Sequence, residues 1–187
     1  MTKPFFFTAV MISPVFAFAA DTNLNLYRPF AETTKHVPVT IESTQKGSCN
    51  SQSDRIKRED AWHCVSERGV TYDPCFSKRF IDDQKVVCPK SPWTGTSVQL
   101  ELNQRLDEHD MRALDISRTM PWAIELVSGE HCLSVASNQS IDGLPVNYRC
   151  MNGVELLGEA HRCSPVWTIL RHDASGTSMA ELASAWF

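Results

Sequence analysis

Seven cysteines stand in this chain, and all of them follow an apolar N-terminal segment. Lys3 precedes the apolar run 4–18, which is too short to cross a bilayer as a helix, and residues 17–19 (Ala-Phe-Ala) have the small-x-small pattern of a cleavage site. We therefore expect residues 1–19 to be a signal peptide. Export would place the cysteines in an oxidising compartment, which predicts disulfide bonds and a periplasmic or secreted protein.

Composition narrows the class of protein. The length after removal of the signal suits one domain with a real hydrophobic core, so disulfides would supplement that core. The net charge is -4 and no basic stripe is present, which argues against nucleic acid as a partner. No second long apolar run follows the signal, so we expect no membrane span after cleavage.

The region before the first cysteine differs from the rest. Residues 20–46 are polar, and Pro29 and Pro38 disfavour a helix, so we expect an extended N-terminal arm. Because residues 21–36 of the arm offer few apolar anchors and no cysteine, they are expected to be dispensable for folding of the rest. Residues 47–187 are expected to form a single disulfide-braced domain.

One short helix is expected, over residues 54–64. Ser53 or Asp54 can accept backbone N–H bonds at a helix start. A rough helical face is formed by Ile56, Trp62 and Cys64 with Ala61. Gly69 would follow its end.

Farther along, the pattern changes to the period of a strand. Apolar and polar residues alternate strictly over 97–102, and residues 122–127 and 131–135 resemble a hairpin. Asn152-Gly153 between two more strands favours a type I′ turn. Further strands are expected at 166–170 and 182–187. The predicted class is α+β with β dominant: one antiparallel sheet of five to seven strands, curled or sandwich-like, with one short helix.

Neighbouring cysteines can be paired across these turn signals, although sequence alone does not choose among connectivities. The pairs are Cys49 with Cys64, Cys75 with Cys88, and Cys132 with Cys150. Cys163 is then the odd thiol, free or joining two chains in a disulfide-linked dimer.

An ordered set of short motifs runs through residues 49–187. The motifs are Ala61-Trp-His-Cys64, Asp73-Pro-Cys-Phe76, Cys88-Pro89, Pro121-Trp122, Cys132, Asn147-Tyr-Arg-Cys150, Pro165-Val-Trp-Thr168 and Ala185-Trp186. In this order they resemble a group of exported, cysteine-containing bacterial proteins, secreted or lipoprotein-like, with no assigned activity. The resemblance implies export and a disulfide-braced domain, and it implies no catalysis. Cys163 and the length of segment 103–118 depart from the pattern.

Histidine stands next to or near cysteine in this chain at His63-Cys64, His131-Cys132 and His161-Arg-Cys163, but no Cys-x-x-Cys occurs and the cysteines are widely spaced. We therefore expect no metal and no cofactor on these thiols. Cys163 could act as a nucleophile with His161 or His172 as its base only if the pKa of its thiol were lowered. The residues around Cys163 show no sequence signature of such a site.

Acidic and aromatic residues give weaker candidates. The acids are Asp82, Asp83, Asp107, Glu108, Asp110 and Glu125, which are expected to be solvated rather than paired for glycoside hydrolysis. Trp93, flanked by Pro92 and Gly95, is the best candidate for an exposed ring that contacts a ligand.

No convergent nucleophile, base or metal set is visible, so the sequence predicts a non-enzymatic exported binding or interaction domain for a protein or another envelope ligand. One alternative is a periplasmic inhibitor of lysozyme-type hydrolases, because Tyr148-Arg-Cys150 matches a short Tyr-x-Cys motif. The other alternative is a small secreted hydrolase that uses Cys163 or an acid pair.

Overall fold

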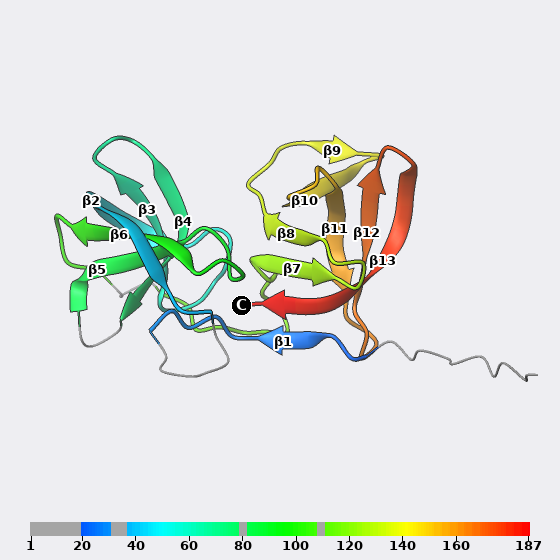
Figure 1. Ribbon diagram of the computed structural model, residues 1–187, viewed down its shortest axis with the longest axis horizontal. Helices are drawn as coiled ribbons and strands as arrows, with labels where there is room; N and C mark the ends of the chain where they lie inside the picture. The colour runs from blue at the N-terminus through cyan, green and yellow to red at the C-terminus, as the bar shows by residue number, and fades with distance from the viewer. Residues whose placement is uncertain (1–19, 31–36, 79–81, 108–110) are drawn as a thin grey trace, which may run out of the picture.

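Strands make up the regular structure of this protein. The structure, a computed structural model, describes residues 20–30, 37–78, 82–107 and 111–187. The strands are β1 (Asn23–Asn25), β2 (Thr40–Gln52), β3 (Ala61–Ser66), β4 (Thr71–Lys78), β5 (Asp82–Pro89), β6 (Thr96–Leu102), β7 (Ala123–Leu126), β8 (His131–Ser134), β9 (Ser140–Ile141), β10 (Leu144–Cys150), β11 (Glu155–His161), β12 (Thr168–Asp173) and β13 (Gly176–Trp186). The fold is therefore β-dominant and braced by disulfides. Instead of one sheet it contains two closed sheets, which lie side by side (Figure 1).

The first barrel consists of β2 to β6 in sequence order. Its neighbouring strands are antiparallel, and β2 closes the barrel by pairing parallel to β6, from Thr40 opposite Thr96 to Gly47 opposite Leu102. Alternation along β6 turns Val98, Leu100 and Leu102 inward, because successive side chains of a strand point to opposite faces. The barrel interior holds Trp62, Cys64, Cys75, Val86, Cys88, Val98, Leu100 and Leu102.

Gly95 allows the first barrel to close. It precedes β6, has a φ of 66°, and its carbonyl accepts the N–H of Thr40 at 2.8 Å. A Cβ atom at this position would lie 2.2 Å from the carbonyl oxygen of Pro38. Only glycine combines this backbone conformation with so close an approach.

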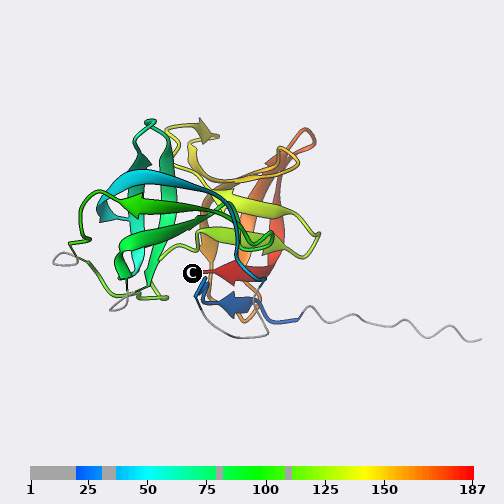
Figure 2. The ribbon, with the colours of Figure 1, turned by 60° about the vertical axis from the view of Figure 1, so that its left-hand side comes forward.

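The second barrel follows the order β7-β8-β10-β11-β12-β13, and β13 pairs with β7 to close it. The long strand β13 pairs with β12 over residues 176–181 and with β7 from Leu182 onward. Strand β1 lies parallel to the end of β13, with Leu24 opposite Ala185, and β9 pairs with the start of β10. Figure 2 shows both barrels and β1 beneath the second one.

A buried aromatic cluster joins the two barrels. Tyr27, which follows β1, has its ring centroid 5.3 Å from Phe76 of the first barrel and 5.4 Å from Trp122 at the start of the second. The Arg58 guanidinium lies 4.5 Å from the centroid of the Phe76 ring. Its Nη1 donates to the carbonyl oxygens of Tyr27 at 2.6 Å and Phe187 at 2.8 Å. The aromatic rings of the junction belong to the same hydrophobic cluster as the interior of the second barrel, whereas the interior of the first barrel forms a cluster of its own.

The N-terminal arm is extended over residues 20–28 and is attached to the second barrel. These contacts argue against the expectation that residues 21–36 are dispensable for folding, which a truncated chain would test. The Thr22 hydroxyl donates to the Leu182 carbonyl at 2.8 Å and accepts the Trp167 N–H at 2.8 Å. Tyr27 is only 4% exposed. Burial of one aromatic ring makes up for the shortage of other apolar anchors.

The expected helix at 54–64 was also wrong, and the described residues contain no helix. Residues 53–60 form turns, and Ala61 begins β3, whose burial alternates in the manner of a strand. Ser53 does accept backbone N–H bonds, from Arg55 at 3.1 Å and Ile56 at 3.0 Å, but they close a turn. Strand β3 pairs with both β2 and β4, so its backbone N–H and C=O groups form hydrogen bonds with neighbouring strands. In a helix the same groups would have to bond within the segment itself.

One local prediction was confirmed and a second only in part. The alternating segment 97–102 lies in β6. Asn152-Gly153 does join β10 to β11, but the turn is not the expected type I′, because φ is positive at Gly153 (86°) and not at Asn152. The structure also forms the three expected cysteine pairs, two in the first barrel and one between β8 and β10 of the second: Cys49–Cys64, Cys75–Cys88 and Cys132–Cys150. Three intramolecular disulfides indicate an oxidising environment outside the cytoplasm.

Candidate functional site

A cleft of about 500 Å³ opens beside the aromatic junction, and we call it the junction cleft. Four segments line it: 26–30 of the arm, 58–60 before β3, the end of β4, and 113–114 of the connection from β6 to β7. Its volume falls within the range of small-ligand and peptide pockets. The cleft therefore depends on chain segments that are far apart in sequence.

The walls of the junction cleft combine apolar and cationic groups. Leu26 and Leu114 are half-buried there, and Phe30 exposes 38% of its surface. Arg28 and Lys78 are exposed on the cleft, and neither has an ion-pair partner in the part of the chain that the structure describes. Their charges are available to a ligand.

The two acids of the cleft are already engaged. Asp60 is held by Arg58, whose Nη2 donates to its Oδ2 at 2.7 Å and whose Nε bonds its Oδ1. Glu59 Oε2 accepts the backbone N–H of Leu114 at 3.1 Å, which ties the connecting segment to the cleft wall. The available charge of the cleft is therefore positive.

A second group of polar residues lies on the first barrel, and we call it the Asp–His cluster: Asp54, His63 and Asp73. His63 Nδ1 lies 3.1 Å from Asp73 Oδ2 and 3.5 Å from Asp54 Oδ2. Asp73 also accepts the Asp54 N–H at 2.9 Å and the Ser53 hydroxyl. Among the residues described, these are the ones whose donor atoms could hold a metal ion.

Sequence reasoning did not find the Asp–His cluster. Its members come from three segments, and the register joins them: Trp62 is opposite Cys75 and Cys64 is opposite Tyr72, with an irregularity between. That irregularity sets His63 beside Asp73. No spacing in the sequence signals it, because it depends on cross-strand pairing.

The structure packs Trp93 between the barrels. Its ring stacks on the His131 imidazole, with centroids 4.3 Å apart and an interplanar angle of 7°, and contacts Trp186 edge-on at 5.0 Å. His131 Nε2 lies 3.5 Å from Glu125 Oε1. A tryptophan, a histidine and an acid thus meet, but neither the junction cleft nor the hollow beside His131 and Met151 is lined by all three. A ligand-binding role for Trp93 stays a prediction.

Cys163 is free and exposed. Within the described ranges, no hydrogen bond connects it to His161 or His172, and His172 Nδ1 instead contacts the Thr177 hydroxyl at 2.9 Å. The geometry offers no base to this thiol. Cys64 and Cys132 are in disulfides, so these two thiols are not available as metal ligands beside His63 and His131.

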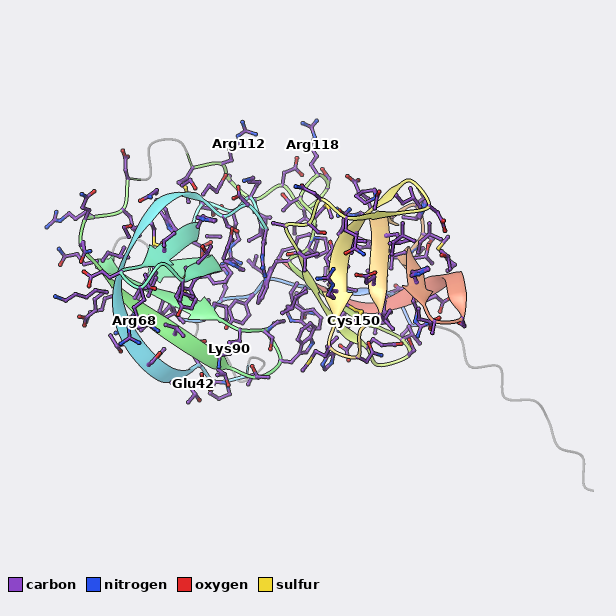
Figure 3. All side chains as sticks on the ribbon, turned by 90° about the horizontal axis from the view of Figure 1, so that it is seen from above. Glu42, Arg68, Lys90, Arg112, Arg118 and Cys150 are labelled. Carbon is purple, nitrogen blue, oxygen red and sulfur yellow. A yellow bond between two sulfur atoms is a disulfide. The ribbon has the colours of Figure 1, made fainter. Side chains whose placement is uncertain are left out.

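The other candidate acids are not brought together by what the structure describes. Asp107 borders a hollow beside Lys57 and Arg112, and Glu125 contacts His131. Glu108 and Asp110 lie outside the described residues, as do the side chains of Asp82 and Asp83. Figure 3 shows Arg112 and Arg118 projecting outward from the connection between the barrels.

The Tyr148-Arg-Cys150 motif has structural partners. Burial raises the pKa of Tyr148, and its hydroxyl donates to the Pro121 carbonyl at 2.9 Å inside the second barrel. Arg149 binds Glu155 on the surface, at 2.9 Å between Nη2 and Oε1. These contacts account for the motif without an external partner.

No family model matches this chain, and no curated protein or solved structure is significantly similar to it. Across the described ranges, no helix is long and apolar enough to cross a membrane.

Proposed function

We propose that this protein is an exported, non-enzymatic binding domain, periplasmic or secreted, whose ligand lies in the junction cleft. The proposal rests on one observation: exposed Phe30 lines the same cleft as two cations, Arg28 and Lys78. Neither cation has an ion-pair partner among the described residues. A ligand that places an apolar side chain next to a carboxylate would satisfy both features. We therefore propose a segment of a partner protein that carries an acidic residue beside an aliphatic or aromatic one.

Physical reasons favour binding over catalysis here. The acids of the cleft are held by Arg58 and by the Leu114 N–H, so they are not free to transfer protons. Arg58 fixes the cleft wall by bonding two backbone carbonyls, which preorganises the surface. A preformed cleft with available charge at its opening has the properties of a recognition site.

Selection from a displayed library of random peptides, followed by calorimetric titration of one enriched synthetic peptide, tests this proposal. We expect enrichment of Asp or Glu beside an apolar residue. The double variant Arg28→Glu, Lys78→Glu should weaken binding at least about tenfold, because two attractive charges become repulsive.

Arg68→Glu is the control, since Arg68 is an exposed cation outside the cleft (Figure 3). It reverses one charge where the double variant reverses two, and it should leave affinity within about twofold. The proposal would be overturned by equal loss in the control, by full affinity in the double variant, or by selection that enriches no acidic peptide.

A further inference from the structure

The Asp–His cluster offers one ring nitrogen and two carboxylate oxygens at close range. The candidate ligand atoms of Asp54, His63 and Asp73 all lie within 4.8 Å of one another. Two atoms bound to one metal at about 2.1 Å stand roughly 3.0 to 3.4 Å apart in octahedral or tetrahedral geometry. The distances from His63 Nδ1 to the two acids, 3.1 and 3.5 Å, match that spacing.

The surroundings hold two of these side chains in place. The Asp73 side chain is only 7% exposed and is fixed by the Ser53 hydroxyl and the Asp54 N–H. His63 lies on β3 with its side chain 31% exposed, and the disulfide of its neighbour Cys64 anchors that strand to β2. Asp54 is 67% exposed and can adjust its carboxylate. Preorganised donors with one adaptable member suit a metal that arrives from solvent.

Charge also favours a cation at this point. Two carboxylates converge on His63, and the cation next to them is Lys57, whose Nζ lies 3.4 Å from Asp54 Oδ1 and also donates to the Ser53 carbonyl. Lys57 offsets one negative charge of the two. A divalent ion would neutralise the remainder, whereas a neutral imidazole would not.

We propose that Asp54, His63 and Asp73 bind a divalent first-row transition-metal ion, with Zn²⁺ as the most suitable species. A mixed nitrogen and oxygen set without thiolate suits Zn²⁺, Co²⁺ or Ni²⁺, while Ca²⁺ prefers oxygen ligands throughout. Three protein ligands leave coordination positions open. The site shares no residue with the lining of the junction cleft, so it does not depend on the proposed function.

Calorimetric titration of the oxidised full chain with ZnCl₂ at pH 7.5 tests this site. A Cys163→Ser background is used, because a free thiol would bind the same ion. We expect one equivalent to bind, and saturation to raise the melting temperature by about 5–10 °C. His63→Asn and Asp54→Asn should each weaken binding at least about tenfold.

His131→Asn is the matched control, since His131 is also half-exposed and also faces a carboxylate, that of Glu125. It should bind Zn²⁺ with unchanged affinity. Absence of binding at 1 mM ZnCl₂, or unchanged affinity in His63→Asn, would overturn the proposal. If a variant fails to fold, Mn²⁺ broadening of the histidine ring NMR signals decides: broadening first at His63 supports the site, and broadening first at another histidine refutes it.

Discussion

The Arg58 guanidinium donates a 2.8 Å hydrogen bond to the carbonyl oxygen of Phe187, a residue 129 positions away. Arg58 is 3% exposed, and the same nitrogen also donates to Tyr27. One side chain of the first barrel therefore holds both the N-terminal arm and the end of the chain against the second barrel. The two barrels are expected to unfold together because this residue and the aromatic cluster are shared.

Arg58→Ala should lower the free energy of unfolding by about 3–5 kcal/mol. The substitution leaves the Asp60 carboxylate and two carbonyl oxygens without their donor, and the loss of one partner of a buried pair is costly. Urea denaturation of the oxidised protein would measure the change. Arg149→Ala is the comparison, because its pairing with Glu155 is on the surface and should cost less than about 1 kcal/mol. Equal costs for the two substitutions would mean that Arg58 does not connect the barrels.

A chain that begins at Val37 should be much less stable than one that begins at Thr22. The shorter chain loses β1, the hydrogen bonds of Thr22 and the buried ring of Tyr27. Removal of one large buried side chain alone costs about 3–5 kcal/mol, or roughly 6–20 °C in melting temperature for a chain of this size. Differential scanning calorimetry would check it. Equal melting temperatures would restore the view that the arm is dispensable.

Cys163 should be the single thiol that reacts in the native, unreduced protein. It is exposed, while the other six cysteines form disulfides. Titration with a thiol reagent should give one equivalent before and after denaturation, and none in Cys163→Ser. Mass mapping that found the label on Cys49 or Cys132 would refute the pairing. If Cys163 joins two chains, non-reducing electrophoresis should show a dimer that Cys163→Ser abolishes.

Stability should fall in acid in a way that depends on Asp173. Hydrogen bonds from the Ser175 hydroxyl and N–H, and then from Arg171, hold the pKa of Asp173 at about 2. A carboxyl whose pKa is depressed in the folded state stabilises the fold above its unfolded pKa of about 4, and this contribution is lost as pH falls toward 2. Asp173→Asn should therefore be less stable than wild type at pH 7, with the gap closing between about pH 4 and 2.

Melting temperatures of both proteins from pH 7 to pH 2 would test this prediction. Arg171 also binds Glu130, whose pKa is lowered mainly by the Ser128 hydroxyl, so some acid sensitivity should persist in the variant. A gap that stayed constant with pH would show that the Asp173 carboxylate does not titrate with folding.

Local features of this chain were readable from sequence because neighbouring residues determine them. The alternation of polar and apolar residues predicted strand β6 and which of its side chains are buried. Gly153 tolerates a positive φ, which predicted the turn between β10 and β11. The cysteine pairs followed from turns between neighbours, and two of them, Cys49–Cys64 and Cys132–Cys150, face each other directly across paired strands. The helix at 54–64 failed because Ile56 belongs to a turn, while Ala61 and Trp62 belong to a strand whose partners lie elsewhere.

Only the tertiary structure decided how the strands close into two barrels and where polar groups meet. The parallel pairings of β2 with β6 and of β1 with β13 join segments with no local signal for each other. The meeting of His63 with Asp73 depends on the register of β3 against β4 and on the irregularity in that pairing. The contact of Arg58 with Phe187 joins residues that are distant in sequence, so its energy appears only when the two barrels are assembled.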